Sequence, residues 1–528
     1  MKQDTVMSSF SLREDYWDNF ELGEDDLEYL YNHLLETEVP ITPGELVELL
    51  VGERIRTEKL EIERQRSSGG DMYMPKEHYE KSQRLVFPQL NWKHAEVVNV
   101  RPGHNPELGA FQVIQVVFKD GEIREYAAGL PEHKLNEPAQ LVEEEDNLNP
   151  EFVLDNYREE LAEKFEQSLE DHGDFVRIAG RWFPRALLVD INIGHLNLAE
   201  AVLDMAGGGP LPTSVLMKEI ELPENVNPRL LEFSMDLALQ EDGRFDEVGA
   251  SGEISWFLQR LEPEQVLEPP IFLRYAGIDY ERSELTEEML ALERELDDEL
   301  SPVTGRYQHL DEVEVRLIYP HWRAGTLPLS ASVRHLFPTA YESPRIRFML
   351  IDGETGDEIP AWVVRTKRYV YGLKEWYEKC GFIPGSIIRV ERGKKPGQVL
   401  VHSDRRRSSR EWIRTVLVGS DGGVVYAMLK QIVQSQFDER MAIAVPDSSG
   451  IDLLWERMAK EKPPFERVVV NTVRELAKLN PQGHVHATEL YAAMNVVRRC
   501  PPAPMLALLA SRPWFSHVGD LHFRHTEA

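Results

Sequence analysis

Apolar side chains recur every three or four residues in several segments of the chain, and this spacing predicts helices with one buried face. The clearest example lies between residues 465 and 479, where five apolar residues keep the spacing: Phe465, Val469, Val473, Leu476 and Leu479. A short extended stretch follows over 483–486, and two further helices are expected over 487–497 and 502–511. The pattern therefore predicts a helix, a short strand and two more helices in front of Phe515.

A short motif recurs three times behind such helical segments. It consists of Phe, two variable residues, Val or Ile, Gly or Ala, a polar turn and an aromatic residue, and it begins at Phe175, Phe245 and Phe515. Small residues at the tip, between two short extended stretches, predict a β-hairpin. We therefore expect Phe245 and Phe515 to be buried in the first strands of two hairpins.

Two other stretches alternate apolar and polar residues, which is the pattern of strands with one buried face. Residues 85–130 alternate over 95–100 and again over 111–118, and we interpret this stretch as a small SH3-like β-barrel. Residues 345–414 predict four strands and one short helix over 372–380. The chain therefore contains β-rich parts as well as helical ones.

The order helix, short strand, helix, helix and β-hairpin resembles the winged helix-turn-helix domain. The Phe-x-x-Val-Gly hairpins at Phe245 and Phe515, each with a terminal aromatic residue, are most similar to the HARE type, which is also found in the delta subunit of bacterial RNA polymerase. Residues 24–66 resemble the first half of that type, and the hairpin at Phe175 is its expected wing, across an insertion. The resemblance covers roughly half of the chain and implies three winged-helix units.

Part of the second alternating stretch resembles the B3-like DNA-binding pseudobarrel. The resemblance rests on the aromatic-rich segment 369–377 and on the segment 384–392. In that family an aromatic-rich helix crosses the barrel and a Gly-Asp pair precedes a strand, whereas this chain has Gly385 and Ser386. The resemblance implies a pseudobarrel with a nucleic-acid-binding face.

The sequence thus predicts an α+β multidomain protein in which repeated winged helix-turn-helix units are interspersed with a small SH3-like β-barrel and a pseudobarrel. The expected parts are an N-terminal winged-helix-like segment over 20–80, the small barrel over 85–135, a helix with a wing-like hairpin over 150–185, an acidic winged helix over 190–265, an acidic connector over 270–335, the basic pseudobarrel over 340–445 and a C-terminal winged helix over 460–528.

The charge balance restricts where nucleic acid can bind. The 528 residues include 59 Lys or Arg and 91 Asp or Glu, so the net charge is −32 and any site for a polyanion must be local. Residues 345–414 carry 16 bases and 9 acids, a net charge of +7, and residues 460–528 carry 9 and 6, a net charge of +3. The rest of the chain therefore carries −42, and the strongly acidic segment 190–265 is repelled by phosphates.

The basic residues of those two segments are the candidate binding residues. Arginine forks suit phosphate oxygens, and Trp412, which lies within the main cluster, can stack on a base. We expect nucleic acid to contact Lys394, Lys395, Arg405, Arg406, Arg407, Arg410, Arg414, Arg498 and Arg499. Two alternatives stay open: the main cluster is a solvated linker or pairs with the acidic domains, and Arg498 and Arg499 complement a helix C-terminus.

The sequence lacks the common short motifs of catalytic and cofactor-binding sites. The sequence has no P-loop, no dinucleotide-binding glycine motif, no nucleophile elbow and no His-Glu-x-x-His. His484 and His486 lack a third ligand at a fixed spacing, so no metal is predicted. We expect a non-enzymatic protein without cofactors, and two cysteines without a signal peptide or membrane span predict a cytoplasmic location with no membrane partner.

Three functions are compatible with these patterns. The first is a nucleic-acid-binding protein, associated with transcription, that contacts phosphates through the pseudobarrel and the C-terminal winged helix with weak sequence selectivity. The alternative is a scaffold whose acidic winged helices bind protein partners. The third is an enzyme of a type that has no short motif.

Overall fold

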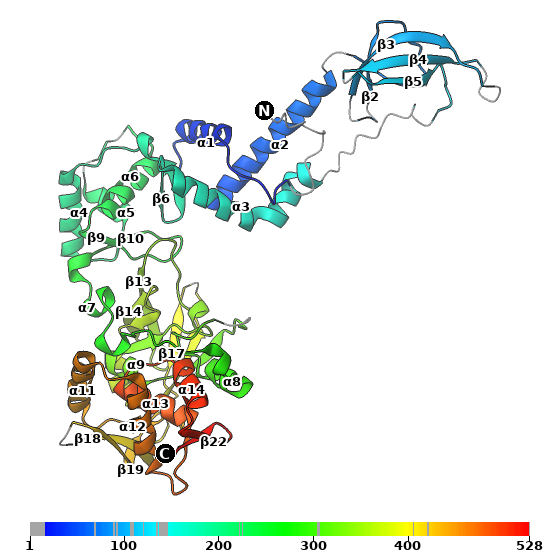
Figure 1. The fold of residues 1–528 in the computed structure, drawn as a ribbon. Helices are drawn as coiled ribbons and strands as arrows, with labels where there is room; N and C mark the ends of the chain where they lie inside the picture. The colour runs from blue at the N-terminus through cyan, green and yellow to red at the C-terminus, as the bar shows by residue number, and fades with distance from the viewer. Residues whose placement is uncertain are drawn as a thin grey trace. The chain divides into compact units, whose positions relative to one another are not determined.

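The computed structural model describes residues 16–526 apart from 68–69, 88–89, 91–92, 106–109, 120, 134–135, 137–145, 221, 224, 304–306, 396, 405 and 420–421. The chain divides into two compact units, one formed by Met1–Val189 with Asn227–Leu230 and the other by Asp190–Val226 with Leu231–Ala528. Both units combine helices with β-sheets (Figure 1). Over the described residues, no helix has the length and apolar character needed to cross a membrane.

The first unit contains three helices and a hairpin that share one apolar core. Leu34 of the first helix, Leu50 of the second and Phe165 of the third are almost completely buried. The hairpin joins them through Trp182, which pairs antiparallel with Ile41 between the first two helices. The elements are α1 (Glu24–Thr37), α2 (Pro43–Ser67), α3 (Pro150–His172), β6 (Phe175–Ile178) and β7 (Arg181–Pro184).

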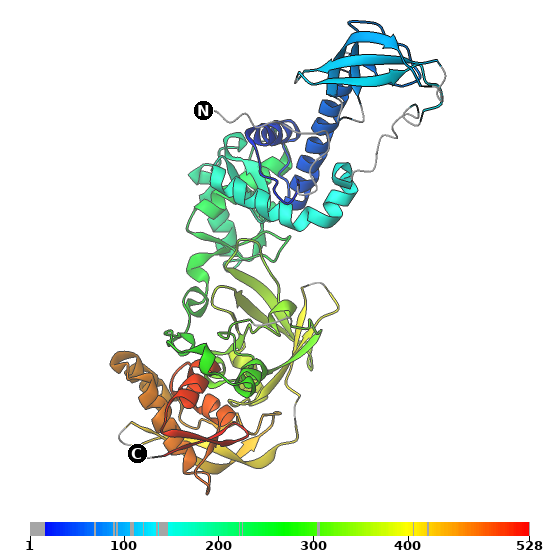
Figure 2. The same cartoon turned by 45° about the vertical axis from the view of Figure 1, so that its right-hand side comes forward.

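A five-stranded sheet is inserted in the sequence between α2 and α3. Its strands follow one another in chain order, with a parallel first pair and antiparallel pairs after it. Figure 2 shows this sheet in light blue. An aromatic cluster fills its core, where Tyr73 stacks on Phe87 with ring centroids 4.7 Å apart. The strands are β1 (Asp71–Met72), β2 (Arg84–Phe87), β3 (Lys93–Pro102), β4 (Gln112–Phe118) and β5 (Ile123–Ala128).

The first part of the second unit repeats the sequence of helices followed by a hairpin. Phe245 lies in the hairpin's first strand and is buried, as the motif predicted. In the same core, the Trp256 indole N–H donates to Asp236 at 3.1 Å and to Thr213 at 2.9 Å. The elements are α4 (Ile193–Met205), β8 (Leu211–Pro212), α5 (Thr213–Leu216), α6 (Pro228–Glu241), β9 (Phe245–Glu247) and β10 (Ser255–Leu258), followed by α7 (Glu264–Leu267).

A seven-stranded sheet follows, in the order β11-β16-β17-β13-β14-β15-β12. Its core includes Trp376 and Tyr377, which the short helix α10 contributes. The strands are β11 (Glu312–Arg316), β12 (Thr326–Pro328), β13 (Arg345–Asp352), β14 (Glu358–Val364), β15 (Tyr369–Tyr371), β16 (Ile387–Arg392) and β17 (Val399–His402), and the helices of this part are α9 (Tyr319–Ala324) and α10 (Lys374–Cys380).

The boundaries of this part differ from the prediction. Segment 270–335, expected to be a connector, contributes β11 and β12, because the alternating residues of β11 pair with β16 and those of β12 pair with β15. At the other end, segment 409–444 leaves the sheet and forms β18 (Ser409–Val418), β19 (Val424–Val433) and β20 (Ile443–Ala444). Residues 345–414 therefore do not make a folding unit, because this segment lacks β11 and β12 of the sheet. It also ends before β19, the strand with which β18 pairs.

The C-terminal part has one large core shared with β18, β19 and with helices that precede the seven-stranded sheet. Phe515 lies in the first strand of the last hairpin and is buried. The third helix, α14, is also buried along most of its length against α8. The elements are α8 (Glu287–Leu296), α11 (Ser448–Glu461), α12 (Phe465–Ala477), β21 (Val485–His486), α13 (Ala487–Val497), α14 (Pro502–Ser511), β22 (Phe515–Gly519) and β23 (His522–His525).

Arg345 of the seven-stranded sheet binds the acidic hairpin at Phe245. Its Nε lies 2.7 Å from Asp246 and 3.2 Å from Glu262, whose side chain is completely buried. Burial raises the pKa of Glu262, and so does the neighbouring Asp246, so Glu262 is neutral and the pair matches the single charge of Arg345. Burial also raises the pKa of Glu247, on the same hairpin, to about 7.

The contribution of Glu247 to the unfolding free energy is therefore expected to fall as pH rises from about 4.5 to 7. An acid whose folded-state pKa is raised keeps its proton longer when folded, so its contribution is complete at low pH and is lost as pH rises through the folded value. Replacing Glu247 by Gln should leave stability at pH 4 unchanged and increase it at pH 8 by about 3 kcal/mol. Urea unfolding at both pH values measures this, and an equal effect at both would contradict the assignment.

Candidate nucleic-acid interface

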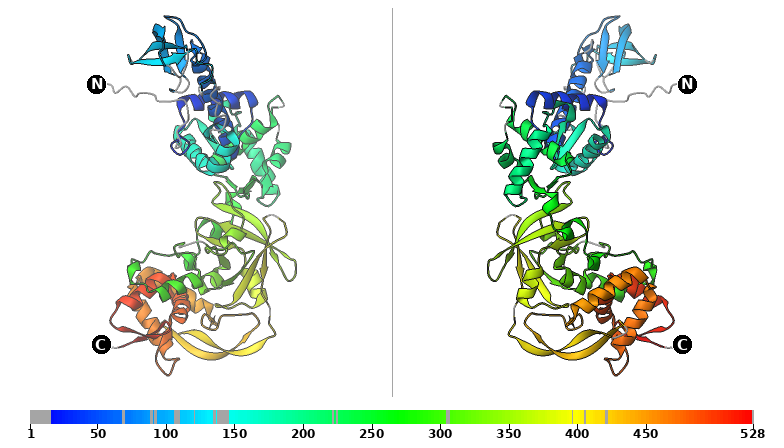
Figure 3. Two further views of the ribbon diagram at one scale, coloured as in Figure 1. Left: turned by 90° about the vertical axis from the view of Figure 1, so that its right-hand side faces the viewer. Right: turned by 90° about the vertical axis from the view of Figure 1, so that its left-hand side faces the viewer.

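The strands β18 and β19 form a long antiparallel ribbon beside the helices of the C-terminal part (Figure 3). Ten residues of each strand pair, from Ser409 with Val433 to Val418 with Val424, and the Arg406 amide extends the pairing by donating to the Gln434 carbonyl at 2.8 Å. We call residues 406–418 and 424–434 the basic ribbon. At its inner end Val416 and Tyr426 belong to the C-terminal core, which anchors the ribbon.

One face of the outer half carries exposed cations around an exposed indole. Arg410 pairs across the strands with Ile432, and Trp412 pairs with Lys430, which places these four side chains on the same face. Trp412 and Ile432 are each 61% exposed, and Lys430 Nζ lies 5.3 Å from the Trp412 ring centroid. The face therefore combines an accessible aromatic ring with positive charge.

The cations of the ribbon's outer half, on both of its faces, lack acidic partners within the part of the chain that the structure describes. Arg406, Arg407, Arg410 and Lys430 form no ion pair with a described carboxylate. The ribbon's single acid, Glu411, lies between Arg410 and Trp412 in the sequence, so its side chain points to the opposite face. By contrast, Arg389 of the neighbouring sheet is bound by Asp404 at 3.0 Å. Four cations therefore remain open to an anionic ligand.

The remaining candidates from the 345–414 segment have different environments. Lys394 and Lys395 are exposed in the turn between β16 and β17, and Arg405 lies outside the described residues. The prediction that Arg414 contacts nucleic acid is wrong, because this side chain is buried where β20 joins β18. Its guanidinium donates to Glu489 at 2.8 Å and to the Arg440 carbonyl at 2.8 Å, which fastens the ribbon to α13.

The two arginines that follow α13 are structural. Arg498 is half-buried, stands 5.7 Å from the Phe465 ring centroid and donates to the Pro463 carbonyl at 3.3 Å. Arg499 is completely buried, so the prediction that it contacts nucleic acid is wrong. Its Nη2 lies 2.6 Å from Asp298 and 2.7 Å from Glu299, two acids of the segment expected to be a solvated connector.

These residues belong to a buried ionic network that sequence reasoning missed. The Tyr491 hydroxyl donates to Asp298 at 2.5 Å, and His321 Nε2 lies 3.1 Å from Glu299. Burial raises the pKa of Asp298, whereas Arg499 and His321 outweigh burial at Glu299 and hold the pKa of that carboxyl well below its usual range. Only the sequence Asp297-Asp298-Glu299 beside apolar Leu296 and Leu300 hinted at buried acids.

The third helices of the three helix-and-hairpin groups do not present a basic face. The helix α14 is apolar all round and buried, α6 has Glu232 and Glu241 on its accessible surface, and α3 has mostly acidic exposed positions. Such surfaces do not favour insertion into a DNA groove. Binding through the C-terminal group, which the sequence predicted, therefore has no support in the position of its third helix.

The described residues contain no candidate metal site, because no group of three or more of their His, Cys, Asp and Glu side chains is arranged to hold an ion. His486 serves as a helix cap that accepts from the Thr488 amide at 3.1 Å. Burial, followed by the nearby Arg440, lowers the pKa of His486 to about 4, so it is neutral at pH 7. No protein-family model, no curated protein and no solved structure matches this chain.

Proposed function

We propose that the protein binds single-stranded nucleic acid, with weak sequence selectivity, through the outer half of the basic ribbon. The observation that supports this is the exposed Trp412 ring beside Lys430, on a ribbon whose Arg406, Arg407 and Arg410 form no ion pair with a described carboxylate. Base stacking on an aromatic ring is worth about 1–3 kcal/mol per base and tolerates any base. A ring stacks on a base only where that base is unpaired, so a single strand is the preferred ligand.

The proposal assigns the helix-and-hairpin groups a structural role. We interpret them as winged-helix units of the HARE type whose third helices do not read a groove: α14 is buried, and α3 and α6 are acidic where they are exposed. The acidic surfaces of the first two groups repel phosphates and leave the basic ribbon as the binding region in a chain of net charge −32. Association with transcription stays a proposal that rests on the resemblance alone.

A second candidate function is a protein scaffold. Arg345 bound by Asp246 and Glu262 is an example, within this chain, of a basic surface docked on the acidic hairpin at Phe245. In addition, β19 is an edge strand with exposed apolar side chains, among them Met428 and Leu429, and such edges can accept a further strand. The two functions differ in their response to nucleic acid.

Fluorescence anisotropy of the full chain with labelled oligonucleotides tests the proposal. We expect single-stranded DNA and RNA of about 20 nucleotides to bind more tightly than the matching duplex, because only unpaired bases reach Trp412. Four neutralised phosphates predict a slope of about −2.8 in log affinity against log salt, or a loss of about 50-fold between about 50 and 200 mM salt. No binding at the lower salt concentration would overturn the proposal in favour of the scaffold.

A further inference from the structure

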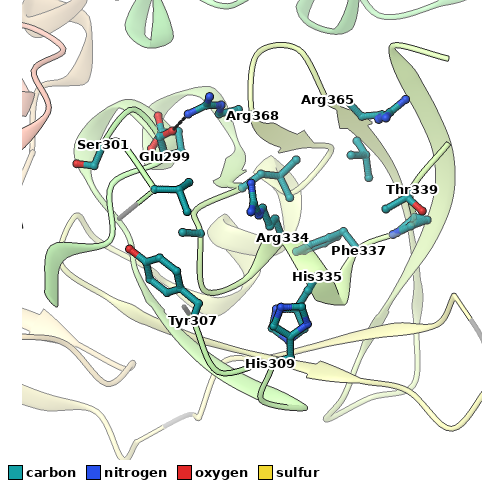
Figure 4. A pocket seen from close by; sticks show the side chains of 15 residues that line it. Glu299, Ser301, Tyr307, His309, Arg334, His335, Phe337, Thr339, Arg365 and Arg368 are labelled. Carbon is teal, nitrogen blue, oxygen red and sulfur yellow. Dashed lines mark hydrogen bonds between the residues drawn. The ribbon is translucent and has the colours of Figure 1, made fainter. Parts of the chain in front are cut away.

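A cavity of about 720 Å³ lies in the part of the second unit built on the seven-stranded sheet, and its lining includes no residue of the basic ribbon. Figure 4 shows three arginines around it, together with Tyr307 and the imidazoles of His309 and His335. Arg334 begins the short 3-10 helix Arg334–Leu336, and Arg365 and Arg368 come from the turn between β14 and β15. The volume falls within the range of about 300–1,000 Å³ that small-molecule sites occupy.

Two of the three guanidinium groups donate to backbone carbonyls and form no ion pair with a described carboxylate. Arg365 Nη1 donates to the Ser343 carbonyl at 2.7 Å, and Arg368 Nη1 donates to the Glu299 carbonyl at 2.9 Å. Arg368 also adopts a left-handed backbone with φ of 57°, in a turn closed by its amide donating to the Arg365 carbonyl at 3.2 Å. Each group keeps further N–H donors, and its position is fixed before a ligand arrives.

The positive charge of the cavity is not neutralised by its own lining. Arg334 forms no ion pair with a described residue, and the single acid in the lining is Glu299. The Glu299 carboxylate already faces Arg499 at 2.7 Å and His321 at 3.1 Å. Three arginines line this cavity without an ion pair to a described carboxylate, in a chain with 91 acids, so the cavity favours an anion with several oxygens.

Flat rings stand on the same lining as these arginines. The His309 and His335 rings are 4.7 Å apart between centroids and inclined by 32°, and His335 is held by a 2.7 Å hydrogen bond from Nε2 to the Leu310 carbonyl. Tyr307 adds a third ring. Such rings offer apolar faces against which a planar heterocycle can stack.

We propose that this cavity binds a mononucleotide that carries at least two phosphates. The phosphates contact Arg334, Arg365 and Arg368, and the base lies against His309, His335 and Tyr307. The site is separate from the basic ribbon, and it takes a small molecule, not a polymer.

Isothermal titration calorimetry of the full chain with ADP, inorganic pyrophosphate and adenosine tests this. We expect ADP to bind most tightly, pyrophosphate more weakly and adenosine not measurably, because the charged groups supply the affinity and the rings add to it. Pyrophosphate binding as tightly as ADP would overturn the assignment of a nucleotide, and so would adenosine binding as tightly as ADP.

The variant Arg334→Glu should weaken ADP binding at least about tenfold, since it removes one cation and adds a repelling charge. Arg334 is exposed and makes no ion pair with a described residue, so the variant should fold. Lys460→Glu, an equal change of charge at an exposed position on α11, should leave ADP affinity unchanged. Equal affinities of the two variants would overturn the proposal.

The triple variant Arg406→Glu, Arg407→Glu and Arg410→Glu should bind ADP as the natural chain does. This variant distinguishes the cavity proposal from the proposed function. Loss of oligonucleotide binding with intact ADP binding is a result about the ribbon alone. Loss of ADP binding with intact oligonucleotide binding is a result about the cavity alone. Loss of ADP binding in this variant would overturn the cavity assignment.

Discussion

Replacing Arg499 by Met should lower the free energy of unfolding of the second unit by about 3–5 kcal/mol. The substitution keeps most of the side-chain volume but leaves Asp298 and Glu299 buried without their cation, since both face the Arg499 guanidinium at 2.6–2.7 Å. Urea unfolding followed by tryptophan fluorescence measures the loss, because Trp455 lies in the same core. This is the largest stability effect that we expect from a single substitution in the chain.

The matched control is the adjacent residue. Arg498→Met removes a half-buried guanidinium that contacts a ring and a carbonyl, and it should cost about 1 kcal/mol or less.

The pH dependence of the Arg499→Met variant gives a second test. Without Arg499 the carboxyls of Asp298 and Glu299 take up protons, so the loss of stability should be smaller at pH 5 than at pH 8. A loss below about 1 kcal/mol for Arg499→Met, or one independent of pH, would contradict the role of the network.

Local patterns predicted the helices and hairpins well. The spacing of apolar residues over 465–479 matches α12, and the motifs at Phe245 and Phe515 lie in the first strands of β9–β10 and β22–β23. These features depend on residues within a few positions of one another, where periodicity and turn residues are informative. The family-level interpretation of these groups as winged helices stays a prediction.

Long-range pairing was not predictable in the same way. In segment 270–335 the stretch Glu312-Val313-Glu314-Val315 alternates, but the surrounding run of acids indicated a solvated connector. Its strand, β11, finds its partner in β16, far along the chain. Similarly, β18 lies within the predicted pseudobarrel of residues 340–445, yet it pairs with β19 and β20 and packs in the C-terminal core.

The candidate binding residues illustrate the limit of charge counting. Arg406 and Arg499 are the same residue type in basic segments, but one is exposed and the other is completely buried beside acids 200 positions away. A sequence gives the net charge of a segment. Whether a particular arginine is available to a ligand depends on the carboxylates and carbonyls that the fold brings next to it. The pairing of Trp412 with Lys430 likewise depends on strand register, which the sequence pattern did not specify.

Reversing the charge of three arginines of the basic ribbon should abolish most nucleic-acid binding. In the full chain with Arg406→Glu, Arg407→Glu and Arg410→Glu, we expect the affinity for a single strand to fall at least about 100-fold at about 50 mM salt. The slope of log affinity against log salt should also become shallower by about 2, because three phosphate contacts are lost. These side chains are exposed and make no ion pair with a described residue, so the fold should persist.

The matched control reverses three exposed lysines near the five-stranded sheet of the first unit: Lys76, Lys81 and Lys119. The change in net charge is identical, so a general electrostatic effect would weaken both variants equally. A local contact weakens only the ribbon variant, and the variant Trp412→Ala should then lose a further part, about 5- to 150-fold, that salt hardly changes, since stacking does not involve counterions. Equal losses in the two charge-reversed variants would show that the ribbon is not the binding surface.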